Sequence, residues 1–280
     1  MDQHTLETAL ADLHIPAIRY FPAVGSTNDA ASAWAYEGAP DGALVVADEQ
    51  TSGRGRGERR WFTQPGMGLA FSLVITPPKM GGAYVMPRLT ALGAVAVRYA
   101  LQRNYNIVPQ IKWPNDVLID RQKVAGVLAE AQWSGEEIKT AILGIGINVA
   151  AGAISDEILP RAEMNFPATS VEEALKKRID RVELLYYVLK ELFYWRPRIH
   201  TNDFLSEWES CLAFRGEWVQ VTAGESYGKD GLPVSLEQMP QPMQEGKVLG
   251  LAMDGSLKLL KKSGEVVSVR VGEVRLGPPK

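Results

Sequence analysis

The chain has 280 residues, of which 46% are hydrophobic and 22% charged, a composition that excludes an intrinsically disordered protein and leaves enough length for a large core. The formal net charge of −3 and the pI of about 5.8 argue against a surface that attracts nucleic acid or an anionic membrane as a whole. The single cysteine, Cys211, excludes a disulfide framework and a zinc site of the usual spacing, and without a leader-like N-terminus or a long apolar run we expect a cytoplasmic protein.

Helices and strands are predicted throughout the first two thirds of the chain. In chain order, the apolar pattern gives a helix at 3–13, a strand at 18–21, a helix at 30–36, strands at 43–48 and 68–75, a helix at 86–103, strands at 110–120, 123–133 and 140–150, and a helix between 182 and 193. Ser26 or Thr27 is the expected N-cap of the helix at 30–36. The long helix at 86–103 is expected to pack on a sheet.

The pattern changes after Cys211. Short strands joined by turns that contain glycine are predicted at 216–223, 246–253, 256–261 and 265–274. We therefore expect a separate small β-barrel over about 212–280. The Pro- and Met-rich stretch 228–246 is expected to be a long loop within it.

The stretch "TSGRGRGERRW" (51–61) follows the strand at 43–48 and alternates glycine with arginine. Glycine lets a ligand approach the backbone, and arginine binds phosphate or carboxylate through two N–H groups at once. The stretch is therefore suited to an anion-binding loop, although it matches neither the Walker A nor the dinucleotide-binding pattern. Taken alone, the motif leaves open a solvated turn and a nucleic-acid-binding arm.

Three further motifs follow, each with an ordinary structural alternative. "KWPND" (112–116) is typical of a turn. "KVAGVLAE" (123–130) places a lysine at the start of an apolar strand, where lysine is usually solvated, and a glycine within the strand. "GIGIN" (144–148) leaves space above one strand face or marks a bulge.

Together and in this order, "GSTND", "ADEQTSGRGRGERRW", "IKWPNDVLI", "KVAGVLAE" and "LGIGINV" resemble biotin–protein ligases (biotin–acetyl-CoA-carboxylase ligases) over about 25–150. "GLAMDGSLKLL" and "VRVGEV" are similar to the C-terminal SH3-like domain of that family. The resemblance implies an α+β fold, in which a mixed or antiparallel sheet with flanking helices forms a class II synthetase-like catalytic domain. We expect that domain at 1–211 and the SH3-like domain at 212–280.

The resemblance implies a two-step reaction. Biotin attacks the α-phosphate of ATP, with Mg²⁺ bridging phosphate oxygens, to give biotinyl-5′-AMP and pyrophosphate. A lysine of biotin carboxyl carrier protein then displaces AMP. The expected partners exclude nucleic acid and membrane, no metal-binding residue is assigned, and a homodimer is compatible with a family whose members often pair through their sheets.

Residues are assigned to roles by matching them to the family motifs. The catalytic assignments are Arg54, Arg56, Asp116 and Lys123. The resemblance gives biotin binding to Ser26, Thr27, Asn28, Gln50, Gly53, Arg54, Gly55, Arg56, Lys123, Gly126 and Gly146, and ATP or adenylate binding to Arg56, Arg59, Trp61, Lys112, Asn115, Lys123 and Asn148. Cations suit the first step because it brings two anions together, and Asp116 is expected to orient or deprotonate the acceptor lysine.

The chain departs from the family at three points. The family loop usually reads G-R-G-R-x-G-R-x-W, whereas Glu58 occupies the sixth position here and Gly57 the fifth. Phe166 is a loose match for the adenine-stacking aromatic of some members. The first motif is reached by residue 25, so we expect no N-terminal DNA-binding domain. The alternatives are a lipoate-type acyl ligase or transferase, and a protein that binds biotinyl-adenylate without transferring it.

Overall fold

A computed structural model describes residues 1–57, 59–76, 82–134, 137–154, 167–222, 226–227, 233–234 and 243–276. The helices are α1 (Gln3–Ala9), η1 (Ala11–Leu13), α2 (Thr27–Tyr36), α3 (Gly82–Tyr105), α4 (Val171–Leu175), α5 (Arg181–Trp195), η3 (Arg196–Arg198) and α6 (Asn202–Ser210). The strands of the first sheet are β1 (Ile18–Val24), β2 (Leu44–Gln50), β3 (Gly68–Ile75), β4 (Gln110–Lys112), β5 (Asp116–Ile119), β6 (Gln122–Ser134) and β7 (Glu137–Asn148). No described helix is long and apolar enough to cross a membrane.

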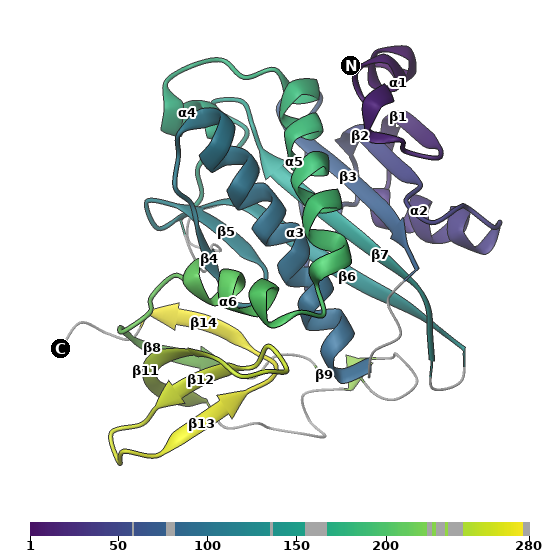
Figure 1. Ribbon diagram of the computed structural model, residues 1–280. Helices are drawn as coiled ribbons and strands as arrows, with labels where there is room; N and C mark the ends of the chain where they lie inside the picture. The colour runs from purple at the N-terminus through teal and green to yellow at the C-terminus, as the bar shows by residue number, and fades with distance from the viewer. Residues whose placement is uncertain are drawn as a thin grey trace.

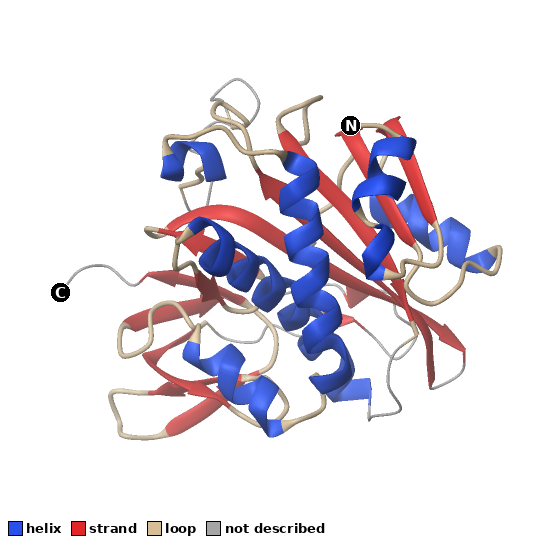
Figure 2. Ribbon diagram, turned by 45° about the horizontal axis from the view of Figure 1, so that its top comes forward, coloured by secondary structure: helices blue, strands red, loops and turns tan. Residues whose placement is uncertain are grey.

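The first sheet is mixed and has seven strands in the order β1-β2-β3-β7-β6-β5-β4. Strand β1 runs parallel to β2, and the remaining neighbours are antiparallel. Helices α3 and α5 pack on one face of the sheet, as Figure 1 shows, and α2 lies on the other face, so the helices enclose the sheet from both sides (Figure 2). The predicted α+β class with a mixed sheet and flanking helices is confirmed.

Two apolar clusters show how the sheet is covered. The larger lies between the sheet and the pair α3 and α5, and it continues into the C-terminal strands. The smaller lies under α2, where Ala31 and Trp34 pack on Ile142 of β7. Because side chains alternate along a strand, Gly144 and Gly146 lie on the same face as Ile142, beyond the part that α2 covers. This glycine-bearing part of the sheet is the floor of the site described below.

Two predicted strands are each two strands in the structure. The stretch predicted as one strand at 110–120 is the β4–β5 hairpin, which turns at 113–115 and contains a cis peptide bond between Trp113 and Pro114. The stretch at 265–274 divides into β13 (Val266–Val269) and β14 (Glu273–Leu276). Gly272 has φ 155, and a Cβ there would lie 2.6 Å from the carbonyl oxygen of Thr222, so the chain passes β8 closely at this point and turns to pair with it. Both divisions bring residues of the site into place.

The C-terminal strands form a five-stranded antiparallel sheet in the order β13-β12-β11-β8-β14, with β8 at Trp218–Thr222, β11 at Gln244–Leu251 and β12 at Leu257–Leu260. The predicted small β unit is thus present as a sheet. Within the predicted loop at 228–246, β10 (Pro233–Val234) pairs with β9 (Ser226–Tyr227) and β11 begins at Gln244, whereas the other residues before 243 lie outside the described part.

Polar contacts join the C-terminal sheet to the rest of the molecule. The buried guanidinium of Arg88, on α3, donates to the carbonyl oxygens of Ile199 at 2.6 Å and of Met253 at 3.0 Å. The indole N–H of Trp113 donates to the carbonyl oxygen of Gly255 at 2.9 Å. Because Trp113 belongs to the "KWPND" turn, this hydrogen bond fixes the turn to the C-terminal unit.

Candidate active site

The Arg/Gly stretch folds as a hairpin-like arm rather than an open loop. Its two sides pair through the amide of Trp61, which donates to the carbonyl oxygen of Gly53 at 2.8 Å, and the amide of Gly55, which donates to that of Arg59 at 2.8 Å. A Cβ on Gly53 would lie 2.3 Å from the carbonyl oxygen of Trp61, so only glycine allows this pairing. Gly53 therefore shapes the arm, which we call the arginine arm (residues 51–62).

The arginine arm lies over a cavity of about 450 Å³, a size typical of a small-molecule site. The predicted residues that line it are Ser26, Thr27, Asn28, Gln50, Arg54, Gly55, Arg56, Arg59, Trp61, Lys112, Asn115, Asp116, Lys123, Gly126, Gly146 and Asn148. The structure thus brings together every predicted site residue except Gly53, which supports the arm. Two predicted features, Glu58 and Phe166, lie outside the described residues.

Trp61 occupies the space that two glycines leave on the sheet. A Cβ on Gly146 would lie 2.3 Å from the indole of Trp61, and one on Gly126 would lie 3.0 Å from it. These two glycines face each other across β6 and β7. The ammonium group of Lys123 lies 5.5 Å from the centroid of the same indole, within the range of a cation–π contact. The glycines therefore admit the arm to the floor of the cavity.

Replacing Gly146 with alanine is expected to displace Trp61, since forcing a methyl group into packed space costs about 1–3 kcal/mol. For biotin, the ligand expected from the sequence resemblance, binding should weaken roughly 10- to 100-fold. Titration calorimetry with biotin measures the change. Gly25→Ala is the control, because a Cβ there meets no atom within 4 Å. Equal affinity for biotin in Gly146→Ala and the unmodified chain would show that Trp61 does not help to form the pocket.

A chain of polar side chains runs along the floor beside α2. The amide of Thr27 donates to Oε1 of Gln50 at 2.8 Å, and the Thr27 hydroxyl lies 3.1 Å from the same oxygen. The hydroxyl of Ser72, on β3, lies 2.8 Å from Oγ1 of Thr27 and 2.7 Å from Oδ1 of Asn28. A Cβ on Gly144 would lie 1.9 Å from that Asn28 oxygen, so Gly144 gives the amide its room. The floor therefore offers fixed donors and acceptors to a polar ligand.

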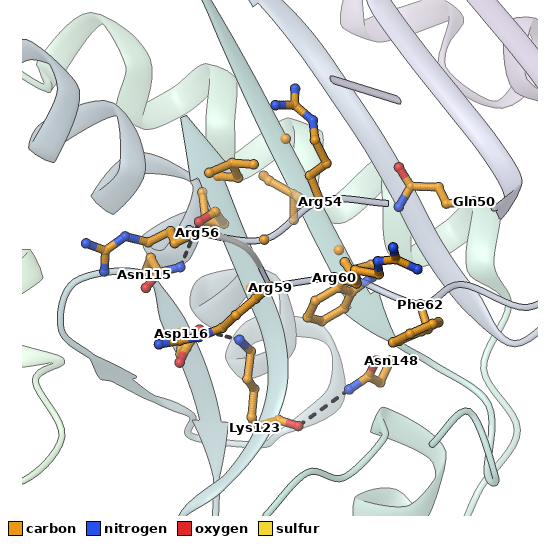
Figure 3. A pocket seen from close by; sticks show the side chains of 18 of the residues that line it. Gln50, Arg54, Arg56, Arg59, Arg60, Phe62, Asn115, Asp116, Lys123 and Asn148 are labelled. Atoms are coloured by element: carbon orange, nitrogen blue, oxygen red, sulfur yellow. Dashed lines mark hydrogen bonds and ion pairs between the residues drawn. The ribbon is translucent and has the colours of Figure 1, made fainter. Parts of the chain in front are cut away.

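The buried Lys112 and Asp116 and the half-buried Lys123 form a charge cluster on the β4–β5 hairpin and the start of β6. The two carboxylate oxygens of Asp116 are 2.6 Å from Nζ of Lys123 and 3.2 Å from Nζ of Lys112. Burial alone would raise the pKa of Asp116, but the two ammonium groups outweigh it and hold the pKa at about 2. Asp116 is therefore an anion at neutral pH, and it holds both lysines at the cavity wall. Figure 3 shows Asp116 beside Lys123.

The C-terminal sheet contributes a second carboxylate to the cavity, that of Glu273, which the sequence did not reveal. Glu273 pairs with both terminal nitrogens of Arg59 and lies 3.6 Å from Nζ of Lys112. One residue earlier, the carbonyl oxygen of Gly272 accepts from Arg56 at 3.2 Å. Residues 272 and 273 thus hold two arginines of the arm. The turn between β13 and β14 places these two residues at the cavity.

Arg54 is engaged on the other side of the cavity. Its guanidinium donates to both carboxylate oxygens of Glu130 at 2.7 and 2.6 Å and lies 2.7 Å from Asp29. Figure 3 shows this side chain pointing away from Lys123 and Asp116. The structure therefore does not bring Arg54 to the charge cluster, although the three cations Arg54, Arg56 and Lys123 border one cavity.

The side chains of Asn115 and Asn148 donate hydrogen bonds to backbone carbonyl groups of neighbouring segments. The Asn115 amide donates to the carbonyl oxygen of Val127 at 3.0 Å, and the Asn148 amide donates to that of Thr169 at 3.2 Å. Both side chains therefore fix neighbouring segments of the cavity wall. Polar and aromatic residues at or beside the cavity to which the sequence interpretation gave no role include Arg60, Phe62, Ser72, Glu130 and Glu273. Ser72 offered a signal, since it is a polar residue within the otherwise apolar strand "GLAFSLVI".

Comparison with known proteins points to one family. The profile of the biotin/lipoate A/B protein ligase family matches residues 20–148. The chain is 39% identical over 170 residues to the bifunctional ligase/repressor BirA of Bacillus spizizenii, an alignment that covers 61% of this chain and 50% of that protein. It is 33% identical over 193 residues to the biotin–[acetyl-CoA-carboxylase] ligase of Paracoccus denitrificans, covering 66% of this chain and 78% of that one.

The fold agrees with these matches. The biotin protein ligase of Aquifex aeolicus, solved in complex with biotin and ATP, has a TM-score of 0.71 with this structure at 29% identity, covering 92% of this chain and 97% of that chain. The chain spans about half the length of the Bacillus relative, whose name also includes a repressor function. On the strength of the Paracoccus match and the family profile, this chain belongs to the biotin/lipoate A/B protein ligase family.

Proposed function

We propose that the protein joins biotin to a lysine of a carrier protein in two steps that consume ATP. In the first, a carboxylate oxygen of biotin attacks the α-phosphorus of ATP and pyrophosphate leaves, which gives biotinyl-5′-AMP. In the second, the amine of the acceptor lysine attacks the acyl carbon, and AMP leaves with the bonding pair. The observation that carries the proposal is that one and the same cavity is bordered by a polar floor on one side and by a cluster of cations on the other.

The floor suits the biotin ring system. Its ureido group needs a few oriented donors and acceptors within a largely enclosed slot, and Thr27, Asn28 and Gln50 are held in fixed hydrogen bonds there. Gly144 and Gly146 let the Asn28 amide and the Trp61 indole lie close against the sheet, so both side chains border the cavity that the ligand would fill. The biotin carboxylate would then extend toward Lys123, the cation between the floor and the charge cluster.

The cations suit adenylate formation. Bringing a carboxylate against a triphosphate concentrates negative charge, and cations that are already fixed in place stabilise that charge with little reorganisation. Lys123 and Lys112 are fixed by Asp116, and Arg59 is fixed by Glu273. Arg56, at the turn of the arginine arm, borders the same space. We assign these four residues to the ATP side of the reaction.

Asp116 is better suited to orient the acceptor lysine than to deprotonate it. A carboxylate with a pKa of about 2 is a weak base toward an ammonium group, whose ordinary pKa is about 10.4. An oxygen of Asp116 can instead accept a hydrogen bond from the incoming amine and so orient that amine beside Lys112 and Lys123. Of the two roles expected from the sequence, we therefore propose the orienting role.

Mg²⁺ is proposed to enter with ATP. The described residues contain no group of three histidine, cysteine or acidic side chains placed to hold a metal ion, and both acids of the cavity, Asp116 and Glu273, are paired with cations. The residues described in the structure therefore do not fit a dedicated metal site, and no step is assigned to a protein-bound metal. ATP oxygens are the usual principal ligands of such an ion.

We infer that the acceptor is a biotin carboxyl carrier protein and that the reaction takes place in the cytoplasm. The Paracoccus relative is named as a ligase of acetyl-CoA carboxylase, which supports a carrier of that kind. We also propose that residues 212–280 form an SH3-like domain, to which the five-stranded sheet would belong. A homodimer and the lack of nucleic-acid binding stay predictions.

The test is to incubate the purified protein with biotin, ATP and Mg²⁺, with and without a carrier domain that bears its target lysine. We expect pyrophosphate release that depends on biotin, and a carrier whose mass rises by one biotinyl group. Pyrophosphate release without carrier labelling would favour the alternative of an adenylate-binding protein. Labelling with lipoate in place of biotin would favour the lipoate-type alternative.

Replacing Glu273 with glutamine is expected to lower kcat/KM for ATP roughly tenfold, because the charge-assisted hydrogen bonds that hold Arg59 are lost. The Kd for biotin should stay unchanged, since Glu273 lies at the cation side. Steady-state pyrophosphate release measures the first quantity and calorimetry the second. Glu265→Gln is the control, because Glu265 pairs with Lys261 on the exposed side of the same C-terminal sheet. An unchanged or higher kcat/KM for ATP would contradict the assigned role of Glu273.

A further inference from the structure

We propose that Glu130 is a positioning residue that couples the biotin floor to the closure of the arginine arm. Glu130 lies on β6, on the glycine-bearing face of the sheet, beside the cavity rather than in its lining. Its carboxylate accepts hydrogen bonds from the guanidinium of Arg54, which belongs to the arm, and from the side-chain amide of Asn28, which belongs to the floor. The inference rests on the proposed function, since it assigns biotin to that floor.

The first contact anchors the arm. Arg54 and Glu130 form a bidentate pair with N–O distances of 2.7 and 2.6 Å, the geometry in which an arginine–carboxylate pair is strongest. The partner is 76 residues away in the chain, so the pair ties the arm directly to the sheet. Arg54 is thereby held at the floor end of the cavity and away from Lys123 (Figure 3). In this chain we assign Arg54 to closing the arm.

The second contact orients the floor. Nδ2 of Asn28 donates to the Glu130 carboxylate at 2.7 Å, while Oδ1 of Asn28 accepts from the Ser72 hydroxyl at 2.7 Å. With an acceptor on one end and a hydroxyl on the other, the buried amide has one favourable orientation. Nδ2 also lies 3.4 Å from the carbonyl oxygen of Leu128, so Glu130 is the nearer of two acceptors that set the direction of this amide.

The two contacts complete a continuous path. It runs from Gln50 through Thr27, Ser72 and Asn28 to Glu130, and ends at Arg54. Gln50 precedes the arm and Arg54 lies within it, so the path closes a ring around the floor. A ligand that fixes the floor groups lowers the cost of fixing Glu130, and with it Arg54. Occupancy of the biotin floor thus favours a closed arm, and Glu130 is the link between them.

Replacing Glu130 with glutamine tests this link, because glutamine keeps the length of the side chain and removes the charge that holds Arg54. We expect the Kd and KM for biotin to rise roughly tenfold, as for loss of hydrogen bonds to a charged group, while the KM for ATP stays within about twofold of that of the unmodified chain. Asp29→Asn is the matched control, since Asp29 also pairs with Arg54 but makes no described contact with Asn28. It should change the Kd for biotin by less than about twofold, as is usual for an exposed pair.

A double-substitution cycle tests whether Glu130 acts through Arg54. In an Arg54→Ala background, Glu130→Gln should add less than about twofold to the Kd for biotin, because coupled residues are non-additive. Arg54→Lys should reproduce the tenfold loss, since lysine cannot form the bidentate pair. Full additivity, or a Glu130→Gln protein that binds biotin normally, would overturn the inference. Failure of the unmodified chain to bind biotin would instead overturn the proposed function.

Discussion

Lys123→Met is expected to reduce biotin-dependent pyrophosphate release about 10²- to 10³-fold, the usual loss when one preorganised charge is removed from a site of developing negative charge. Lys123 lies where the biotin floor meets the charge cluster, in contact with Asp116 and beside the Trp61 indole. Methionine retains the apolar length that packs on that indole, so the loss reports on the charge. The measurement is single-turnover formation of pyrophosphate at saturating biotin and ATP.

Lys139→Met provides the matched control. Lys139 lies on the neighbouring strand β7 but does not line the cavity, and its replacement should leave the rate within about twofold, as for an ordinary surface substitution. The biotin Kd of Lys123→Met, taken without ATP, separates binding from chemistry. A Lys123→Met protein with a normal single-turnover rate would remove Lys123 from the mechanism and leave Arg56 as the main cation of the first step.

Asp116→Asn is expected to destabilise the folded chain by about 3–5 kcal/mol at neutral pH, the usual cost of removing one member of a buried ion pair. Lys112 is 2% exposed, so its charge would be left with a neutral amide where the carboxylate had been. Urea denaturation measures the loss. Glu37→Gln, which breaks an exposed pair with Arg19, is the control and should cost about 1 kcal/mol or less. Equal stability of Asp116→Asn and the unmodified chain would contradict the buried cluster.

The stability difference between the unmodified chain and Asp116→Asn is expected to depend on pH. The folded-state pKa of Asp116 is lowered from 3.8 to about 2, so its stabilising contribution is fully present above pH 3.8 and is lost as the pH falls through about 2. The difference in unfolding free energy between the unmodified chain and Asp116→Asn should therefore be constant above that window and shrink within it. Urea denaturation at a series of pH values checks this, and a difference that grows as the pH falls would have the wrong sign.

The motifs along the first 150 residues predict the residues that line the cavity only through the family resemblance that they carry together. Each motif lies at the end of a regular element, so the fold brings them to one place. Strand β3 coincides with its prediction at 68–75, and "KVAG" and "GIGIN" lie side by side on β6 and β7, where Gly126 faces Gly146. The residues that were missed act across long separations. Glu273 reaches Arg59 from 214 residues away, and Glu130 reaches Asn28 from 102 residues away.

Strand boundaries were less predictable where a turn is short. The sequence predicts one strand at 110–120 although "KWPND" is typical of a turn, because β4 has only three residues (Gln110–Lys112) and its turn consists of Trp113, Pro114 and Asn115. The break at Gly272 was missed because "VVSVRVGEV" alternates like a single strand, and only the close passage of β8 requires a glycine there. The start of helix α4 is predictable from the sequence, since Ser170 and Glu173 have the spacing of a capping box and form one in the structure.

The central claim is that one cavity holds biotin on the polar floor and ATP at the charge cluster. Its most direct test is to mix the protein with biotin and ATP-Mg²⁺ without a carrier, remove free ligand, and identify the bound molecule by mass spectrometry. We predict biotinyl-5′-AMP bound in about a one-to-one ratio, as for a reactive intermediate kept from water by a closed site. Lys123→Met, stopped when the unmodified protein has completed one turnover, should yield about a hundredth of that amount or less. Recovery of unreacted biotin and ATP from the unmodified protein would contradict the claim.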